Sequence, residues 1–278
     1  MRPSIPTIPD KAVIASFRRA VYRAFGDNGR DLPWRGTTDP YRILVSEVML
    51  QQTQVVRVVE KYTTFLERFP DLPALAGATL AEVMAAWQGL GYNRRALMLK
   101  RAAEAVIKRF DGVIPSDEKS LRLLPGIGPY TAAAVCAFAF NQPVVLIETN
   151  IRSVFIHHFF GDRKKVRDEE ILPLIEATLD RKNPRRWYSA LMDWGAALKS
   201  QVENPGRKSA HYTRQSPFEG SDRQIRGRIL NRLIAGGKRS TKILIAELGG
   251  DSSRVRDILE RLDQEGIVVK EKRSYRIA

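Results

Sequence analysis

Helical periodicity from residue 10 to about residue 200 is the feature that most limits the folds open to this chain. Apolar residues recur three and four positions apart beside charged ones in segments such as DKAVIASFRRAVYRAF, LAEVMAAWQGL, NRRALMLKRAAEAVIKRF and EEILPLIEATLDR. This spacing is typical of amphipathic helices that pack on a shared core. Turns rich in Gly and Pro, such as DLPWRGTTDP and DGVIPSD, separate the helical segments. We therefore expect a mainly α fold.

The sequence changes character after residue 200, where QVENPGRKSAHYTRQSPFEGSD is polar and lacks periodicity. Three helical segments follow, and the chain ends in GIVVKEKRSYRIA, two short β-prone runs around a charged turn. Three helices and a β-hairpin are typical of a winged helix, which commonly binds DNA. A protein-binding or purely structural winged helix is the alternative. The predicted organisation is a helical domain at 1–200, a linker at 201–221 and a winged-helix-like domain at 222–278, with helices near 222–235, 240–248 and 251–265.

The composition points to a nucleic-acid partner. The chain of 278 residues has 46 Lys and Arg against 31 Asp and Glu, a net charge of +15. Such an excess favours binding to a polyanion, although a generic basic surface remains the alternative. The longest apolar run, AAAVCAFAF at 132–140, is too short to cross a bilayer, and the first residues lack a signal-peptide core. We expect a cytoplasmic protein, associated with the nucleoid if it is prokaryotic, with no membrane partner.

A short hairpin between two helical segments is the most specific motif. LLPGIGPYTAAAVCAF places Gly126 and Gly128 two residues apart, which permits a tight turn and brings backbone N–H groups close to a ligand. Pro129 suits the first turn of the next helix, and exposed N–H groups at a helix start favour phosphate. This hairpin can hold a DNA backbone without reading its sequence.

The string LPGIGPYTAAAV resembles the helix-hairpin-helix of the DNA glycosylase superfamily, which includes endonuclease III and the A/G-specific adenine glycosylases. Four further strings resemble the adenine glycosylases more than the other branches: LPWR at 32–35, PYRILVSEVMLQQTQV at 40–55, WQGLGYNRRALML at 87–99 and MDWGA at 192–196. The similarity covers about residues 10 to 200 in order. It implies a two-lobed helix-hairpin-helix fold and an enzyme that flips a base out of duplex DNA and hydrolyses its bond to the sugar.

Glu47 is the predicted general acid. It lies in SEVMLQQT, which resembles the family's segment with this role, and its apolar neighbours would desolvate it and keep it protonated. A solvated glutamate on a helix surface is the alternative. Gln51, Gln52 and Tyr92 resemble the residues that enter the duplex around the flipped base, with core packing as the alternative for Tyr92.

Glu148 is the predicted carboxylate that faces the sugar, which develops positive charge as the bond breaks. It follows Tyr130 by eighteen residues, the spacing that the superfamily keeps between its hairpin residue and its catalytic aspartate. The adenine glycosylases have Asp-Gly-Asn here, whereas this chain has Glu148-Thr149-Asn150, so only Asn150 matches. A working shifted carboxylate, a different substrate and a much slower enzyme are all compatible with this change. So is a glutamate that only favours the start of a helix.

Two further departures concern cofactors and recognition. Most members of this branch carry a four-cysteine iron–sulfur cluster after the MD-x-GA string, but Cys136 is the single cysteine of this chain. We therefore expect no cluster and no resident cofactor other than a monovalent cation at the hairpin. Lys199, Arg207 and Lys208 in this region are expected to keep some DNA contact. Well-studied adenine glycosylases sense 8-oxoguanine with a C-terminal domain, whereas this sequence shows only the short winged-helix-like tail. The sequence therefore does not support recognition of an A·8-oxoG pair, with recognition by the small domain in a different way as the alternative.

The sequence thus predicts a monofunctional DNA glycosylase of base excision repair that acts on a mispaired base, most simply adenine. Tyr130 lacks the amine with which the endonuclease III branch forms a Schiff base, so no lyase activity is expected. The partner is double-stranded DNA with a mismatched or damaged base, bound by a monomer. The DNA-binding candidates also include Arg94 and Arg152. A thymine or uracil mismatch glycosylase, and a non-catalytic DNA-binding protein on the same fold, are the alternatives.

Overall fold

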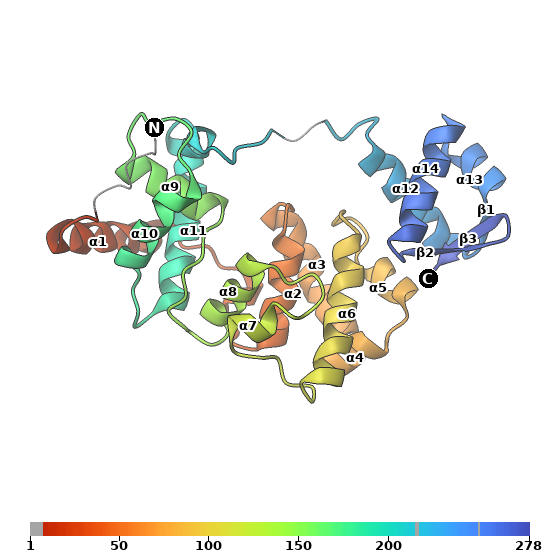
Figure 1. Cartoon of the computed structure of the whole chain (residues 1–278), viewed down its shortest axis with the longest axis horizontal. Helices are drawn as coiled ribbons and strands as arrows, with labels where there is room; N and C mark the ends of the chain where they lie inside the picture. The colour runs from red at the N-terminus through yellow and green to blue at the C-terminus, as the bar shows by residue number, and fades with distance from the viewer. Residues whose placement is uncertain (1–7, 215–216, 250) are drawn as a thin grey trace. The chain divides into compact units, whose positions relative to one another are not determined.

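The computed structural model describes residues 8–214, 217–249 and 251–278. Its chain forms two compact units, each built from several pieces of the sequence. Unit 1 consists of residues up to 43, 116–122 and 128–214, and unit 2 of residues 44–115, 123–127 and the tail from 215. The mainly α fold that the periodicity predicts is confirmed, and helices dominate both units (Figure 1).

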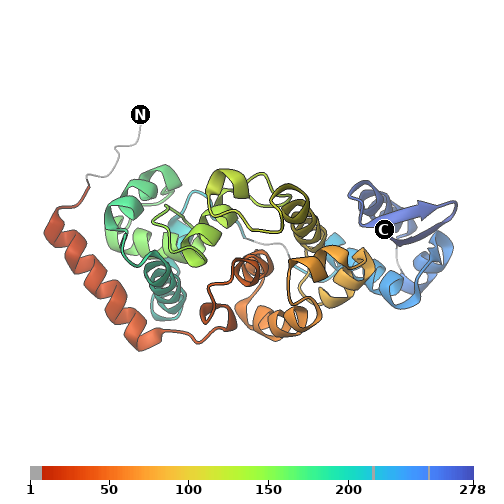
Figure 2. The same cartoon turned by 90° about the horizontal axis from the view of Figure 1, so that it is seen from below.

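Unit 1 is organised around α11 (Pro184–Gln201), which packs against α1 (Lys11–Asn28) and α9 (Thr149–Phe159) (Figure 1, and from below in Figure 2). Its core contains an aromatic cluster in which the rings of Phe17 and Phe155 lie 5.3 Å apart. The remaining elements are η1 (Pro33–Arg35), α7 (Glu118–Leu121), α8 (Pro129–Phe138), α10 (Asp168–Thr178) and η2 (Pro205–Lys208).

Unit 2 contains most of α2 (Pro40–Leu50), followed by α3 (Val55–Arg68), α4 (Leu72–Gly77), α5 (Leu80–Ala86) and α6 (Arg94–Arg109). The start of α5 shows how the sequence sets an element's boundary. Thr79 caps the backbone N–H of Glu82, whose carboxylate returns a bond to the N–H of Thr79. This reciprocal capping box fixes the first turn of the helix.

The tail of unit 2 has the three helices and the hairpin that the sequence predicts. These elements are α12 (Asp222–Gly236), α13 (Thr241–Leu248), α14 (Ser252–Gln264), β2 (Val268–Glu271) and β3 (Ser274–Ile277). β2 pairs antiparallel with β3, with Lys270 opposite Tyr275. A two-residue strand that the sequence analysis missed, β1 (Arg239–Ser240), adds to the other edge and gives the order β1-β3-β2.

The first half of the segment predicted as a linker, 201–221, packs against unit 1. η2 lies against α9, and Ser209 forms a parallel bridge with Val166. The bridge rests on two backbone hydrogen bonds, from Val166 N–H to Lys208 O and from Ala210 N–H to Val166 O. Residues 215 and 216 lie outside the described residues.

Candidate active site

Glu148 caps the N-terminus of α9. Its Oε1 accepts hydrogen bonds from the backbone N–H groups of Asn150, at 2.7 Å, and Ile151, at 2.9 Å. The residue is extended, with φ −136°, as expected of a cap that follows an irregular apolar run. Glu148 is therefore a helix-start residue, the role that the sequence analysis weighed against catalysis. Its surroundings show what else it can do.

Glu148 is half-buried, which ordinary capping does not require. This burial raises the pKa of Glu148, while the two N–H donors and the charges of Lys199 and Arg152 act in the opposite direction. Burial of a carboxylate disfavours its charged form unless donors and cations compensate. A titratable group whose pKa is shifted by burial and by nearby charges is a candidate catalytic residue.

Lys199 and Asn150 complete the surroundings of Glu148. The Nζ of Lys199 donates to the Oδ1 of Asn150 at 2.6 Å, and the Nδ2 of Asn150 donates to the Oε2 of Glu148 at 3.2 Å. Desolvation lowers the pKa of Lys199. Lys199 comes from the last turn of α11, so two helices far apart in the sequence place a cation beside the carboxylate. We expected Lys199 to contact DNA and did not predict this arrangement.

Gly195, in the MDWGA string, lets α11 approach the start of α9. A Cβ atom added at Gly195 would lie 2.2 Å from the carbonyl oxygen of Asn150, closer than any side chain allows. This contact is with backbone, so it cannot be relieved by a side-chain rotation. Glycine at this position is therefore a condition for the observed placement of Asn150 and, through it, of Glu148.

Asp193, two residues before Gly195, anchors the LPWR string to α11. Its side chain is fully buried and forms ion pairs with Arg30 and Arg35. It also accepts a bond from the backbone N–H of Arg30 at 2.9 Å. Burial alone would raise the pKa of Asp193, but the bonds and charges of the two arginines outweigh it and hold that pKa below its ordinary value. The two strings that carried the family resemblance in this part of the chain thus form one structural unit.

We expect Lys199→Met to move the acidic limb of the rate–pH profile to higher pH. The charge of Lys199 lowers the pKa of Glu148, so its loss raises that pKa further and leaves less ionised carboxylate near neutral pH. Single-turnover rates measured across pH should fall on the acidic side of the profile and recover on the alkaline side. Lys199→Arg should retain the wild-type profile. An equal fall at every pH would contradict this role and leave Lys199 as a structural residue.

Arg152, a predicted DNA-binding residue, is engaged within unit 1. Its Nε and Nη2 donate to the two carboxylate oxygens of Asp168 at 2.7 Å each, and only 15% of its side chain is exposed. This bidentate pair joins α9 to the start of α10. Lys208 likewise donates to the carbonyl of Gly161 at 2.7 Å. The sequence pattern predicts neither Asp168 as the partner of Arg152 nor Gly161 as the partner of Lys208.

Glu47 is buried in unit 2, with 5% of its surface exposed. It lies on α2 with Val45, Val48 and Met49, all buried, as its neighbours in sequence. The alternative of a solvated surface glutamate is therefore excluded. The structure places Glu47 with Gln51, Gln52 and Tyr92 in unit 2, and Glu148, Asn150 and Tyr130 in unit 1.

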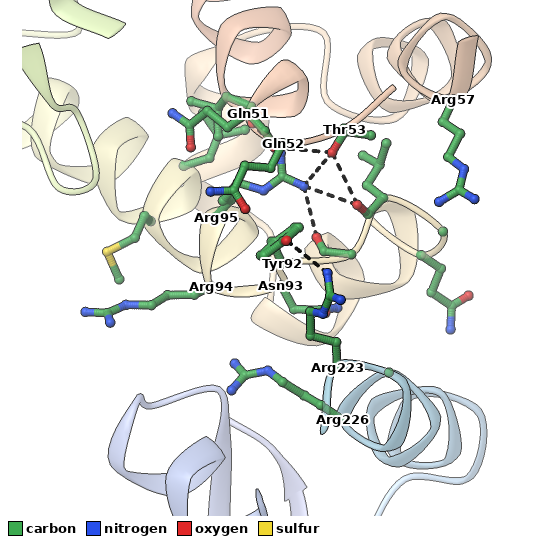
Figure 3. A pocket seen from close by; sticks show the side chains of 18 of the residues that line it. Gln51, Gln52, Thr53, Arg57, Tyr92, Asn93, Arg94, Arg95, Arg223 and Arg226 are labelled. Carbon is green, nitrogen blue, oxygen red and sulfur yellow. Dashed lines mark hydrogen bonds between the residues drawn. The ribbon is translucent and has the colours of Figure 1, made fainter. Parts of the chain in front are cut away.

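Arg95, which sequence reasoning missed, fixes the loops that carry Gln51, Gln52 and Tyr92 (Figure 3). Its Nη1 donates to the carbonyls of Val48, Met49 and Gln51 at the end of α2, and its Nη2 donates to Thr53 Oγ1 and to the carbonyls of Leu90 and Gly91. Burial lowers its pKa to about 10, so it stays charged at neutral pH. One guanidinium thus ties the end of α2 to the turn before α6.

Gln52 and Tyr92 both have positive φ angles, 53° and 46°, which residues other than glycine rarely adopt. Strained positions of this kind cluster at binding sites. The side chain of Tyr92 is exposed rather than packed in the core, which rejects the alternative considered for it. Arg94 is exposed beside it. We call Gln51, Gln52 and Tyr92 the wedge, because the sequence resemblance predicts that they enter the duplex around the flipped base.

The hairpin has the geometry that its glycines predict. Gly126 has φ +75°, and a Cβ there would lie 2.5 Å from the Cβ of Met98. Gly128 caps α8, whose first residue is Pro129. Both glycines are exposed, and no acceptor in the described part of the chain pairs with their N–H groups. Tyr130 is half-buried and packs on the core of unit 1.

Residues 45–176 match the family described as HhH-GPD superfamily base excision DNA repair protein. An adenine DNA glycosylase of Mycolicibacterium smegmatis is 37% identical over 221 residues, which cover 73% of this chain and 75% of the relative. The thymine/uracil-DNA glycosylase of Pyrobaculum aerophilum is 40% identical over 164 residues, which cover 58% of this chain and 70% of the relative.

Solved structures agree with this fold. A thermostable thymine-DNA glycosylase matches with a TM-score of 0.61 at 25% identity, over 69% of this chain and 90% of that one. Endonuclease III in a trapped covalent complex with DNA matches with a TM-score of 0.53, over 76% of this chain and 92% of that one, and at 20% identity it supports the fold alone. The resemblance read from the motifs is confirmed: this chain belongs to the helix-hairpin-helix (HhH-GPD) superfamily of base excision DNA repair proteins, and within it to the family of the adenine DNA glycosylases.

Proposed function

We propose that this protein is a DNA glycosylase that hydrolyses the N-glycosidic bond of a mispaired adenine. The observation that carries the proposal is the half-buried carboxyl group of Glu148, held by two backbone N–H groups and flanked by Lys199. The named activity of the adenine DNA glycosylase relatives supports adenine as the base. In the described part of the chain, no helix is long and apolar enough to cross a membrane.

The proposed reaction assigns one role to each carboxyl group. Glu47 donates a proton to adenine, which is a poor leaving group until it is protonated. As the bond to the sugar breaks, positive charge develops on the sugar, and the ionised Glu148 stabilises it. Water then adds to the sugar and loses a proton, which balances the one that Glu47 gave to adenine, and an abasic site and free adenine remain. The donors on Glu148 hold its oxygens in place, so the carboxylate needs no reorganisation during the reaction.

The glutamate in place of the family's aspartate is compatible with this role. The longer side chain of Glu148 folds back onto its own helix, and its Oε1 accepts from the second and third following residues. The carboxyl group thereby stays at the helix N-terminus, where the helix dipole favours negative charge. Thr149, where the family has glycine, adopts the first position of α9.

The experiment that tests the function is a panel of duplexes assayed with excess protein. Abasic sites should form at adenine opposite guanine or 8-oxoguanine. Abasic sites only at T·G or U·G pairs would instead support the thymine/uracil activity named for the Pyrobaculum aerophilum relative. Tight binding without base release from any duplex would support the non-catalytic alternative.

We also propose that the enzyme is monofunctional, because Tyr130 has no amine to form a Schiff base. Lys199 is the amine bonded to Asn150 beside Glu148, so it is the residue to exclude. Borohydride added to the protein on abasic DNA should trap almost no covalent complex, and Lys199→Ala should remove any trace. Stoichiometric trapping by both proteins would contradict the prediction.

The protein is expected to fold without an iron–sulfur cluster. A cluster of the family's type needs four cysteine ligands, and the chain has only Cys136, which is buried and donates to the carbonyl of Ser116. Iron analysis of the purified protein should find no iron above background, and about four irons per chain would contradict the expectation. A monovalent cation at the hairpin stays a prediction.

A further inference from the structure

A pocket of about 1060 Å³ lies in unit 2 between the wedge and the tail helix α12 (Figure 3). We call it the α12 pocket. One side comes from the end of α2, the turn before α6 and the hairpin, and the other comes from the tail. Its polar and aromatic lining includes Gln51, Gln52, Arg57, Gln88, Tyr92, Asn93, Arg94, Arg95, Phe218, Arg223, Gln224, Arg226, Arg228, Asn231 and Glu265.

The lining is strongly basic. It contains six arginines and a single acid, Glu265. That acid is already engaged by Arg226, whose two Nη atoms donate to it at 2.8 and 2.5 Å. Within the described residues, Arg57, Arg94 and Arg228 form no salt bridge. The pocket therefore carries uncompensated positive charge, which attracts phosphate.

The rest of the lining suits a nucleobase. Tyr92 and Phe218 expose 37% and 60% of their surface and offer aromatic faces on which a base can stack. Glutamine and asparagine amides, which can both donate to and accept from the edge of a base, surround them. The volume, about 1060 Å³, lies just above the upper end of the range for pockets that hold a small ligand.

Contacts within unit 2 join the tail to the wedge. Arg223 Nη1 donates to the hydroxyl of Tyr92 at 3.3 Å, and Gln88 Nε2 donates to Asn231 Oδ1 at 3.3 Å. In Figure 3, Arg223 points from α12 toward Tyr92. The tail thus supplies one wall of a shared site.

The residues that line the pocket do not include the two carboxylates proposed for catalysis. Neither Glu47 nor Glu148 lines it, although Val48, the next position on α2, and Gln51, just after the end of α2, do. We propose that the α12 pocket binds one nucleotide of the duplex other than the one that is excised, with phosphate on the arginines and the base on the aromatic and amide side chains. This inference rests on the proposed function only in taking duplex DNA as the ligand.

The proposal assigns DNA contact to α12 rather than to α14, the helix that a winged helix would be expected to insert in a groove. On α14, Arg254 and Arg261 both pair with Asp222. In the hairpin of β2 and β3, Glu271 pairs with Arg276 and also with Lys238, which precedes β1. These internal pairs offset part of the positive charge that those elements would otherwise present to DNA.

Gly227→Glu tests the pocket directly. Gly227 lies in the lining on α12, and a Cβ added there meets nothing within 4 Å. Glutamate is also a better helix former than glycine by about 0.5–1 kcal/mol, so the variant should fold. It places a negative charge where the proposal places phosphate. Binding to a short duplex with a tetrahydrofuran abasic analogue should weaken about tenfold or more, measured by anisotropy over a range of salt concentrations.

Arg256→Glu is the matched control. Arg256 is exposed on α14, outside the pocket, and its replacement changes the net charge twice as much as Gly227→Glu does. Its affinity should stay within about twofold of wild type. A larger loss in Arg256→Glu than in Gly227→Glu would overturn the proposal in favour of α14. Wild-type or tighter binding by Gly227→Glu would also overturn it, because α12 would then be irrelevant to binding or would block the wedge.

Two further variants separate phosphate from base. Arg223→Ala should weaken binding and reduce the slope of log affinity against log salt by about one. Phe218→Ser should weaken binding several-fold without changing that slope, because stacking releases no counterions. Full affinity in Phe218→Ser would overturn the assignment of a nucleotide. These readouts need no catalysis, so a protein that binds the analogue but releases no base would defeat the proposed function and leave this inference standing.

Discussion

Glu148→Gln should lower the single-turnover rate of base release by about 10²- to 10⁴-fold while leaving affinity for an abasic analogue nearly intact. Glutamine preserves the Oε1 that caps α9 but removes the charge that we propose faces the sugar. Glu47→Gln should cause a loss of similar size, because it removes the proposed proton donor. Glu67→Gln, at an exposed position of α3, is the matched control and should react at the wild-type rate.

Glu148→Asp shows whether the site is built for the longer side chain. If it is, the carboxylate retreats from its donors and the rate falls. If glutamate is only tolerated, the rate stays or rises. Full base release by Glu148→Gln, by contrast, would reduce Glu148 to a helix cap.

The thermal stability of Glu148→Gln separates the two roles independently. Burial raises the pKa of Glu148 in the folded state, so the charged carboxylate costs stability at any pH above that pKa. The neutral variant should therefore melt at a higher temperature near pH 7, by about 2–4 °C for each kcal/mol regained. The gain should begin to shrink as the pH falls through the raised pKa and should vanish only below the ordinary pKa of a glutamate, where the unfolded chain is protonated as well. A lower melting temperature at pH 7 would mean that the charge stabilises the fold.

Asp193→Asn should be the most destabilising single polar substitution in unit 1, at about 3–5 kcal/mol. The fully buried carboxylate compensates two arginines, and the variant leaves Arg35, only 18% exposed, without its partner charge. That cost is a large fraction of the total stability of a domain. Because the pKa of Asp193 is depressed in the fold, its contribution is present near neutral pH and is lost as the pH falls through that value.

Urea unfolding of Asp193→Asn and Asp162→Asn provides the comparison. Asp162 is fully exposed, and among the described residues it pairs with Lys208, so its substitution should leave stability close to that of the wild type. A loss below 1 kcal/mol in Asp193→Asn would show that the ion pairs barely exceed their desolvation cost. Their role in joining the LPWR string to α11 would then rest on packing alone.

Patterns that are local in sequence predict the helices and turns. They do not predict the contacts between segments that are far apart in the sequence. The helices of the tail, the hairpin glycines and the start of α9 follow from periodicity, turn residues and capping, which act over a few positions. The placement of Lys199 beside Asn150 depends on the close approach of α11 and α9 at Gly195, across 49 positions of sequence. No periodicity encodes such an approach.

Arginine roles were the least predictable part of the site. Arg94 and Arg95 are adjacent and equally basic, yet Arg94 is exposed and Arg95 is enclosed by six hydrogen bonds. Arg152 pairs with Asp168 across a turn that the sequence does not define. A guanidinium serves as well for backbone carbonyls or a carboxylate as for phosphate, so only the fold decides among them.

The identity of the released base tests the central claim most directly. Excess protein should be incubated with duplexes that hold adenine opposite guanine or 8-oxoguanine, and free base, abasic sites and strand breaks should be quantified from the same reaction. The account predicts free adenine equal in amount to the abasic sites, with the strand intact until alkali is added. Release of thymine or uracil but not adenine, or no base from any duplex that the protein binds, would contradict it.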